Sequence, residues 1–420
     1  MSSSFFSAPL AGRPFSGSVS IPGSKSLTNR EILLSAIANG KSVLHKPLFS
    51  RDSQLMIDAI KALGAEVVQT DHSVEINPAS FDNSASIHCG LAGTVMRFVP
   101  LLATLNKGIV RFDADKEALQ RPLDGVFEAL GQLGVQYSRQ GSNFPFEVMG
   151  TGSVDATEVV LDASKSSQFV SALMLVAARF EKGLTITHSG ASLPSIPHIE
   201  MTISCLRDRG VQVVEKSQTS WQILPGEISA KELTVEPDLS NAGAFLAGAM
   251  VTAGELTVND WPEQTTQVGK QYIKLLGQMG AKFEFVEEGL KISSDGTISG
   301  IEADLSEAGE LAPTIAGLAV LADSPSRLSG ISHLRGHETN RLLALTTEIN
   351  RIGGNATETE DGLEIIPTEL SGGSWHTYHD HRMATTGAII GLRAPIQIEN
   401  IETTSKTMPE FKDLWMGLVS

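Results

Sequence analysis

Apolar and polar residues follow one another along the chain in a pattern that recurs six times. Each recurrence begins with a polar or glycine-rich stretch, continues as an apolar helix, breaks, and ends in a short strand. The helices are apolar around most of their circumference, which is typical of helices buried inside a domain. The six segments cover residues 24–44, 91–112, 164–187, 238–258, 306–328 and 380–398.

A second series of helices lies between these segments, and each of its members ends in an apolar residue followed by glycine. The interval of about 70 to 76 residues is longer than a solenoid repeat and suits a small α/β unit. Glycine is favoured where a helix ends in the left-handed conformation before the chain turns into a strand. We therefore predict helix ends at Gly64, Gly134, Gly210, Gly280 and Gly353.

The number of units determines the predicted domain organisation. A chain of 420 residues is too long for one ordinary core, so the six α/β units predict two domains of three units each. We expect a first domain over residues 18–230 and a second domain over residues 1–17 and 231–420. In this arrangement the N-terminal arm packs on the later domain.

Charge and composition narrow the choice of partners. The net charge of −16 and the aromatic content of 5% disfavour binding to nucleic acid, which needs a positive field and stacking side chains. Cys89 and Cys205 are far apart and have neither disulfide nor zinc spacing. No run reaches the ~18 apolar residues that span a membrane. We expect a cytoplasmic protein with no membrane or nucleic-acid partner.

The first apolar helix has a start that suits anion binding. Pro22 and Gly23 break the preceding strand, and Ser24, Lys25 and Ser26 then open the helix. The first turn of a helix has unpaired N–H groups and the positive end of the helix dipole, to which this chain adds hydroxyls and an ammonium. A Ser-capped helix with a solvated lysine is the alternative interpretation.

The other buried helices also begin with polar or glycine-containing stretches. If the buried helices pack in parallel, their N-termini converge from both domains on one cleft, and their dipoles add to the nearby cations. Such a cleft suits substrates with phosphates and carboxylates, because the guanidinium fork binds both groups bidentately. The cations expected there are Lys25, Arg30, Arg121, Arg335, Arg341, Arg382 and Lys406.

Seven motifs carry a resemblance to a known family. They are PGSKSLTNR, LAGTVMRF, LQRPLDGV, SKSSQFVSALML, LRGHETNRL, HDHRMA and SKTMPEF. Their order and spacing, between about residues 20 and 412, resemble those of the 5-enolpyruvylshikimate-3-phosphate synthase family. The resemblance implies an α/β fold of two inside-out barrel domains, each of three βαβαββ units, with parallel buried helices that point their N-termini at the interdomain cleft.

The same resemblance implies a reaction. Members of the family transfer the enolpyruvyl (carboxyvinyl) group of phosphoenolpyruvate to the 5-hydroxyl of shikimate 3-phosphate and release phosphate, in chorismate and aromatic amino acid biosynthesis. Addition followed by elimination through a tetrahedral intermediate needs an acid and a base on opposite sides of one carbon pair, and cations that fix the carboxylate and the phosphate. The resemblance implies no metal, no organic cofactor and a monomer, and glyphosate is the inhibitor that targets this family.

Candidate site residues are carried over from the family motif by motif. The shikimate 3-phosphate set is Lys25, Ser26, Arg30, Ser166, Ser167, Gln168, Ser195, Glu310 and His337. The phosphoenolpyruvate set is Lys25, Gly93, Arg121, Gln168, Arg341, Arg382 and Lys406. Glu310 matches the base that takes the proton of the 5-hydroxyl, Glu338 matches a candidate proton donor, and Lys25 and His337 complete the catalytic set.

Several positions depart from the family pattern. Glu310 and Asn340 each replace a common Asp, His337 replaces a common Lys, and Leu91 replaces a common Asn. Histidine titrates near neutrality whereas lysine does not. These departures bear on affinity, pH optimum and glyphosate sensitivity rather than on the type of reaction. Arg97 is expected to be a structural ion-pair partner rather than a ligand.

Two other kinds of function are compatible with such units. The sister enolpyruvyl transferase that acts on UDP-N-acetylglucosamine shares the fold, but it typically has a Cys in the loop before its Arg-Pro pair, and residues 113–121 here contain none. A non-catalytic anion-binding module, or an RNA-end-processing relative, is the other alternative. The acidic charge and the scarcity of aromatic residues disfavour RNA.

Overall fold

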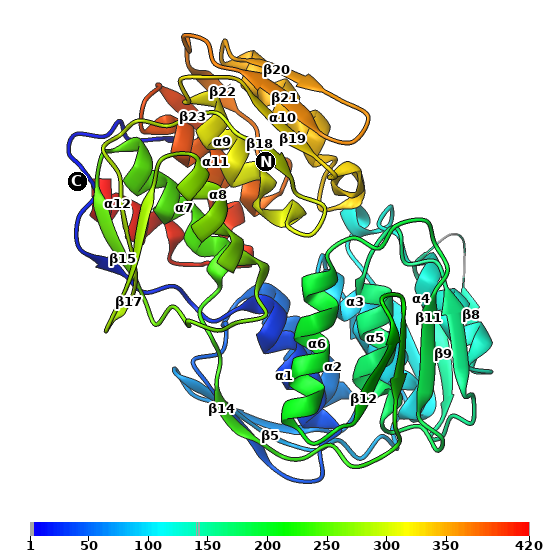
Figure 1. The fold of residues 1–420 in the computed structure, drawn as a ribbon. Helices are drawn as coiled ribbons and strands as arrows, with labels where there is room; N and C mark the ends of the chain where they lie inside the picture. Colours follow the sequence, from blue (N-terminus) through cyan, green and yellow to red (C-terminus); the bar gives the residue numbers. More distant parts are fainter. Residues whose placement is uncertain (1–3, 140, 142, 420) are drawn as a thin grey trace. The chain divides into compact units, whose positions relative to one another are not determined.

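The computed structural model describes residues 4–139, 141 and 143–419. These residues divide into two compact units, each with its own hydrophobic core (Figure 1). The central unit is Gly23–Val235, and the terminal unit combines the segment up to Pro22 with the segment from Glu236 onwards. The predicted two-domain α/β class is therefore confirmed.

The central unit repeats one arrangement of strands three times. Its sheets have the strand orders β14-β3-β5-β4, β6-β7-β9-β8 and β10-β11-β13-β12. In each sheet the first two strands are parallel and the remaining pairs are antiparallel. The helices are α1 (Lys25–Ala36), α2 (Arg51–Ala62), α3 (Gly93–Leu102), η1 (Ala103–Leu105), η2 (Lys116–Ala118), α4 (Asp124–Gln132), α5 (Gln168–Ala177) and α6 (Ile196–Asp208). The strands are β3 (Ser42–His45), β4 (Glu66–Gln69), β5 (Ser73–Asn77), β6 (Ala85–His88), β7 (Lys107–Asp113), β8 (Gln136–Arg139), β9 (Phe146–Thr151), β10 (Glu158–Leu161), β11 (Leu184–His188), β12 (Val213–Ser217), β13 (Ser220–Ile223) and β14 (Glu232–Thr234).

The terminal unit repeats the same arrangement, and its last sheet has three strands. The strand orders are β16-β17-β15-β2, β18-β19-β21-β20 and β1-β23-β22. The helices are α7 (Leu239–Val251), η3 (Val268–Gln271), α8 (Tyr272–Gln278), η4 (Gly309–Leu311), α9 (Ala312–Val320), η5 (Ser332–Gly336), α10 (Arg341–Arg351), α11 (His381–Gly391), η6 (Ile401–Lys406) and α12 (Phe411–Val419). The strands are β1 (Phe5–Ser7), β2 (Ser18–Val19), β15 (Glu255–Asn259), β16 (Lys282–Val286), β17 (Gly289–Ser293), β18 (Glu302–Asp304), β19 (Ser326–Ser329), β20 (Asn355–Glu358), β21 (Leu363–Ile366), β22 (Gly373–Trp375) and β23 (Ile396–Glu399).

Two short strands lie on the opposite side of the expected boundaries. Ser18 and Val19, expected at the start of the first domain, form β2 and pair in parallel with β15 of the terminal unit. Glu232–Thr234, expected at the start of the second domain, forms β14 and pairs in parallel with β3 of the central unit. The chain therefore crosses after Pro22 and after Val235, because each connecting strand completes the sheet of the unit that it leaves.

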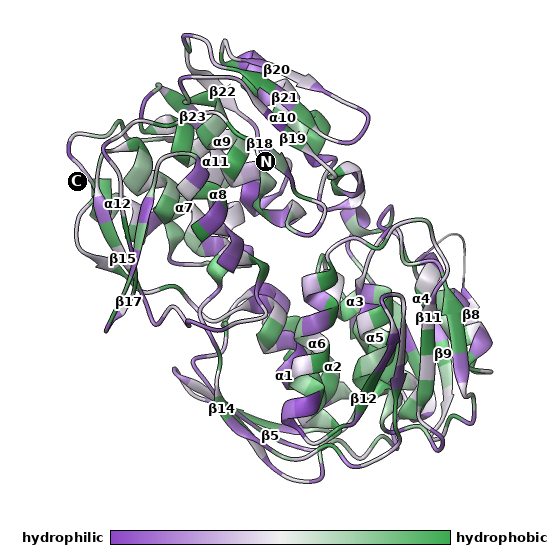
Figure 2. Ribbon diagram, in the orientation of Figure 1, coloured by the Kyte–Doolittle hydropathy of each residue, from purple (hydrophilic) through white to green (hydrophobic). Residues whose placement is uncertain are grey.

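The six apolar helices of the sequence pattern are α1, α3, α5, α7, α9 and α11, and they are buried along most of their length. In the terminal unit α7, α9 and α11 contact one another, and in the central unit α5 contacts both α1 and α3. Strands such as β10 alternate exposed and buried positions, so one face of each sheet covers the helices. Figure 2 shows the contrast between α9, which is largely hydrophobic, and α6, which mixes hydrophobic and hydrophilic residues.

The predicted helix ends are also confirmed. Gly64, Gly134, Gly210, Gly280 and Gly353 follow α2, α4, α6, α8 and α10, and their φ angles lie between 72° and 113°. A side chain with a Cβ is strained at such angles, so glycine lets each helix end and the chain turn into the next strand.

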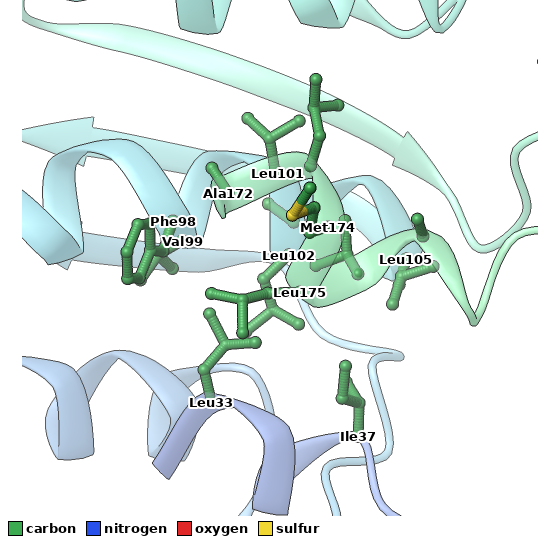
Figure 3. Packing of buried hydrophobic residues seen from close by; sticks show 14 of the residues in the cluster. Leu33, Ile37, Phe98, Val99, Leu101, Leu102, Leu105, Ala172, Met174 and Leu175 are labelled. Atoms are coloured by element: carbon green, nitrogen blue, oxygen red, sulfur yellow. The ribbon is translucent and has the colours of Figure 1, made fainter. Parts of the chain in front are cut away.

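The core of the central unit is formed where its buried helices meet. Figure 3 shows Leu175 of α5 close to Leu33 of α1 and Leu102 of α3, and none of the three side chains is accessible to solvent. These residues lie in the C-terminal halves of their helices, and their packing there joins the three helices into one core. Within the described part of the chain, no helix is long and apolar enough to cross a membrane.

We expect Leu175→Ala to lower the free energy of unfolding by about 2 to 5 kcal/mol, because it leaves a cavity among three helices. Val160→Ala is the matched control, because Val160 in β10 is 40% exposed and its truncation should change the free energy by about 0.5 kcal/mol or less. Urea unfolding followed by circular dichroism measures both. Equal unfolding midpoints for the two variants would contradict the packing described here.

Candidate active site

The buried helices of the central unit begin with few side-chain caps. At α1 the Ser24 side chain accepts a hydrogen bond from Leu27 N at 3.4 Å. Ala92 and Ser167 occupy the N-cap positions of α3 and α5 without a side-chain cap bond, and at α5 the preceding Ser166 Oγ accepts from Gln168 N instead. Uncapped N–H groups at the positive end of a helix favour an anion.

Two guanidinium groups lie against the start of α3. A Cβ at Gly93 would lie 2.9 Å from Arg121 Nη2 and 3.2 Å from Arg97 Nη1, so only glycine leaves room for both groups. Arg121 Nη1 donates to the carbonyl oxygen of Leu91 at 2.8 Å, and its buried Nε has no hydrogen-bond partner within the described residues. Arg97 Nη1 donates to Gln168 Oε1 at 2.8 Å. Arg97 thus fixes a predicted ligand, which agrees with a structural role.

Lys25 has an acidic neighbour that the motif comparison did not include. Its Nζ lies 3.8 Å from Asp52 Oδ2, and the Asp52 side chain is only 2% exposed. Asp52 stands in the first turn of α2, which begins with a capping box between Ser50 and Ser53. An acidic residue two positions after a Ser N-cap was a visible signal for a helix start, but not for this partner. The ion pair holds the ammonium at the start of α1.

Arg30 is directed into the central unit. Its Nε donates to Thr202 Oγ1 at 2.8 Å, its Nη1 to the Ser26 carbonyl at 2.9 Å and its Nη2 to the His198 carbonyl at 3.0 Å. The guanidinium also lies over the Phe98 ring, with 5.4 Å between Cζ and the ring centroid. Because Arg30 is only 1% exposed, its donors bind α1 to α6, and it holds Ser26 through the backbone.

The remaining predicted residues of the central unit lie at the starts of α5 and α6. Ser166 Oγ accepts a hydrogen bond from Gln168 N at 3.3 Å, and Ser167 is the N-cap residue of α5. Ser195 precedes α6 with a φ of 56°, and Pro197 occupies the first turn. Since α5 contacts α6 and α3, the structure gathers these residues with Gly93 in one unit.

The terminal unit holds its buried cations with carboxylates. Arg341 Nε donates to Asp380 Oδ2 at 2.7 Å, and Arg341 Nη2 donates to Glu338 Oε2 at 2.9 Å. Lys406 Nζ donates to the other oxygen of Glu338 at 2.8 Å. Burial opposes the charge of Arg341, but the carboxylates of Asp380 and Glu338 outweigh it and raise its pKa. Arg341 therefore stays charged at every pH of interest.

Glu310 and Arg382 both form hydrogen bonds with Ser240. Ser240 Oγ donates to Glu310 Oε1 at 2.9 Å, and Arg382 Nη1 donates to the carbonyl oxygen of Ser240 at 2.7 Å. Arg382 Nη2 lies 3.7 Å from Glu310 Oε2. Tyr272 Oη also donates to the Ser240 carbonyl at 3.3 Å, and burial raises the pKa of Tyr272 to about 12. Ser240 therefore joins the predicted base to a predicted phosphoenolpyruvate ligand, a role that the sequence motifs did not suggest.

Asp380 connects the cluster of Arg341, Glu338 and Lys406 with the cluster of Glu310, Ser240 and Arg382. It caps α11, where its Oδ1 accepts from Arg382 N at 2.8 Å, and it also binds the Arg341 guanidinium. The two residues before it, Tyr378 and His379, have φ angles of 54° and 57°. Left-handed backbone at a residue other than glycine costs roughly 1 to 3 kcal/mol, so other contacts must hold this turn.

Two histidines lie near Arg341 and Gly309. Arg341 Nη1 lies 3.3 Å from His337 Nδ1, and since a guanidinium only donates, that nitrogen accepts. A lysine ammonium could not make this contact, because it has no acceptor. The His333 ring lies 5.7 Å from that of His337, and a Cβ on Gly309 would lie 2.5 Å from His333 Nε2. Asn340 caps α10 by accepting from Leu343 N, as an Asp would.

Arg335 is the predicted cation that the structure brings to neither of the two clusters that Asp380 connects. Its Nε and Nη2 donate to Glu358 Oε1 at 3.0 Å and 2.6 Å, and its Nη1 donates to the Glu360 carbonyl at 2.9 Å. A local ion pair with β20 therefore engages Arg335, and the expectation that it belongs with the other cations stays a prediction.

The predicted site residues of the two units supply the chemistry of acid–base catalysis on an anionic substrate. The central unit offers Lys25, Arg121 and uncapped helix amides, and the terminal unit offers three cations beside two carboxylates, Glu310 and Glu338. Fixed cations neutralise anionic groups, while carboxylates transfer protons. Throughout residues 4–139, 141 and 143–419, no cluster of three or more His, Cys, Asp or Glu could hold a metal ion.

Comparison with known proteins agrees with this geometry. The family model of EPSP synthase (3-phosphoshikimate 1-carboxyvinyltransferase) matches residues 10–415. A 3-phosphoshikimate 1-carboxyvinyltransferase of Kocuria rhizophila is 51% identical over 421 aligned positions, which cover 97% of this chain and 95% of the relative. The family model matches nearly the whole chain, and the chain folds into two units. Together these findings define the class of the protein as a two-domain enzyme. The chain belongs to the EPSP synthase family, as the motifs predicted.

Solved structures agree on the fold. Two structures of EPSP synthase from Acinetobacter baumannii superpose with TM-scores of 0.82 and 0.81. Each covers 99% of this chain and 98% of its own, at 23% sequence identity. At this identity the likeness supports the architecture, and the residue assignments depend on the contacts described above.

We expect the protein to lose stability as the pH falls through the range from about 6.5 to 4, in part because of His333. Burial, together with the charge of Arg341, lowers the pKa of His333 to about 4. In this range the unfolded chain binds a proton at His333 that the folded chain does not, so stability is complete above about pH 6.5 and decreases below it.

Melting temperatures between pH 7.5 and pH 5 should therefore fall less for His333→Gln than for the wild type. His72→Gln is the control, because His72 is exposed and its loss should leave the wild-type slope. Parallel pH profiles for the wild type and His333→Gln would show that another group causes the acid sensitivity.

Proposed function

We propose that the protein transfers the enolpyruvyl group of phosphoenolpyruvate to the 5-hydroxyl of shikimate 3-phosphate and releases phosphate. The observation that carries this proposal is the 51% identity to a 3-phosphoshikimate 1-carboxyvinyltransferase over nearly the full length of both chains. The paired cations and carboxylates of the terminal unit support it, because addition to an enol phosphate needs both.

Phosphoenolpyruvate carries a carboxylate and a phosphate, so it needs several cations. We propose that residues of both units supply them. The contacts of Gly93 with Arg121 support an anion site at the start of α3, and the Glu338 bridge supports a second group of donors. The proposed ligands are Lys25, Gly93, Arg121, Gln168, Arg341, Arg382 and Lys406.

Shikimate 3-phosphate is assigned chiefly to the central unit. The starts of α1 and α5 offer serine hydroxyls beside the backbone amides of a first helical turn, an arrangement that suits a phosphate. Arg30 has its donors bound to protein oxygens, so its proposed part in binding is to fix Ser26 and the loop of His198. The proposed ligands are Lys25, Ser26, Arg30, Ser166, Ser167, Gln168, Ser195, Glu310 and His337.

The chemical step divides between the two carboxylates. Glu310 takes the proton from the 5-hydroxyl as the oxygen attacks C2 of phosphoenolpyruvate, and Ser240 and Arg382 hold its oxygens in place. Glu338 or Lys25 protonates the methylene carbon, which gives the tetrahedral ketal. Removal of a proton from the new methyl group then expels phosphate and restores the double bond. His337 contributes through its contact with Arg341.

We further propose that the enzyme acts in the cytoplasm as a monomer. Cys89 and Cys205 are buried free thiols, which suits a reducing compartment. A molar mass of one chain in light scattering would support the monomer.

The first test offers phosphoenolpyruvate together with shikimate 3-phosphate or UDP-N-acetylglucosamine, and detects the enolpyruvyl adduct by mass spectrometry. We expect an adduct and stoichiometric phosphate with shikimate 3-phosphate alone. An adduct with the sugar nucleotide would favour the sister transferase, and no adduct with either acceptor would favour a binding module.

Lys25→Met should reduce kcat at least about 100-fold, because it removes a cation that contacts both substrates. The melting temperature should change little, since Lys25 lies at a partly exposed helix start, with a side chain that is 20% exposed. Lys41→Met is the matched control, because that lysine pairs with Glu75 at the surface and should retain wild-type turnover. Normal turnover in Lys25→Met would remove Lys25 from the catalytic set.

Gly93→Ala should raise the KM for phosphoenolpyruvate by roughly 10- to 100-fold, because the added methyl group overlaps Arg121 Nη2 and forces the guanidinium to move. Inhibition by glyphosate should weaken in parallel, whereas the KM for shikimate 3-phosphate should change by about 2-fold or less. Gly131→Ala, in α4 with no neighbouring atom within 4 Å of the new carbon, is the control. An unchanged KM for phosphoenolpyruvate would place its anionic groups away from α3.

A further inference from the structure

A fully buried carboxylate of the terminal unit has no part in the proposed chemistry. Glu348 lies in the last turn of α10 and is inaccessible to solvent. Its Oε1 accepts from Tyr378 Oη at 2.6 Å, and its Oε2 accepts from His376 N at 3.0 Å. Arg351 donates to both oxygens, at 3.2 Å and 3.0 Å, and balances the charge. A buried carboxylate with four hydrogen bonds fixes whatever it binds.

The groups that Glu348 binds lie just before the start of α11. His376 and Tyr378 belong to the segment that leads to Asp380, which caps α11 and binds Arg341. Arg341 is the first residue of α10, and Glu348 is in the last turn of the same helix. Both ends of α10 therefore hold one short segment, residues 376–380, and the contacts form a closed ring.

The segment needs such support. Tyr378 and His379 both have left-handed backbone angles, which residues other than glycine rarely adopt. Burial and the hydrogen bond to Glu348 raise the pKa of Tyr378 to about 12, so its hydroxyl keeps its proton and remains a donor. The hydroxyl thus ties the centre of the turn to α10.

We infer that Glu348 is a positioning residue for phosphoenolpyruvate binding. Through Tyr378 and the backbone of His376 it holds the turn that places Asp380, and Asp380 in turn aligns the guanidinium of Arg341 and the start of α11 with Arg382. The inference rests on the proposed function, because it takes Arg341 and Arg382 as ligands of phosphoenolpyruvate. Glu348 itself touches no substrate.

The test compares Tyr378→Phe and Glu348→Gln with the wild type in steady-state assays that vary each substrate separately. We expect the KM for phosphoenolpyruvate to rise about 10-fold in both variants, as for the loss of one hydrogen bond to a charged group. The KM for shikimate 3-phosphate should change by about 2-fold or less, because its ligands lie outside residues 376–382. Tyr378→Phe also guards against misfolding of the Glu348 variant, because the Tyr378 side chain is partly exposed.

Two further variants separate positioning from loss of stability. Val258→Ala truncates a fully buried side chain of β15 and should lower the melting temperature without changing either KM. His379→Gly, added to Tyr378→Phe, should restore most of the KM for phosphoenolpyruvate, since glycine adopts the left-handed angle without strain. A purely structural role would not give this rescue.

The inference is overturned if Tyr378→Phe and Glu348→Gln leave the KM for phosphoenolpyruvate within about 2-fold of the wild type. It is also overturned if they raise the KM values for phosphoenolpyruvate and shikimate 3-phosphate equally. If the wild type itself shows no turnover, the proposed function fails instead. Crystal structures of the wild type and Tyr378→Phe then decide the positioning role: displaced Asp380 and Arg341 side chains support it, and an unchanged pair overturns it.

Discussion

The burial of six apolar helices inside two units is the constraint on which the rest of the structure depends. A buried helix satisfies its internal N–H groups but not those of its first turn, so every such helix needs polar neighbours at its start. Lysines, arginines, serines and carboxylates therefore gather there, and the same amides and dipoles that require them also attract anions. The ligand chemistry of this chain follows from the way in which its cores are built.

Within each unit, carboxylates partner the cations at the helix starts, so an acidic chain still places positive charge there. Asp52 beside Lys25, Asp380 and Glu338 beside Arg341, and Glu310 beside Arg382 reduce the repulsion between like charges. Each of these carboxylates occupies donors that a phosphate or carboxylate ligand would otherwise engage. The geometry that organises the site therefore also limits how tightly it binds, which suits an enzyme that must release phosphate.

The sequence was sufficient for features that depend on local pattern. Buried helices were evident from apolar residues on every face, and helix ends such as Gly64 and Gly353 from glycine after an apolar residue. Contacts between distant segments were not predictable in this way. Nothing near Ser240 indicates that it joins Glu310 to Arg382, and nothing near Arg30 indicates that its donors turn inward to α6. Such contacts exist only once the helices are packed.

The pairing of β14 with β3 has a consequence for the growing chain on the ribosome. The first sheet of the central unit stays incomplete until residues 232–234 have been made, because β14 forms its edge beside β3. Strand β1 (Phe5–Ser7) lacks its partner for longer, because it pairs with residues 397–399, which are synthesised late. The N-terminal arm therefore remains without its strand partner during most of translation, and the terminal unit cannot be completed from a truncated transcript.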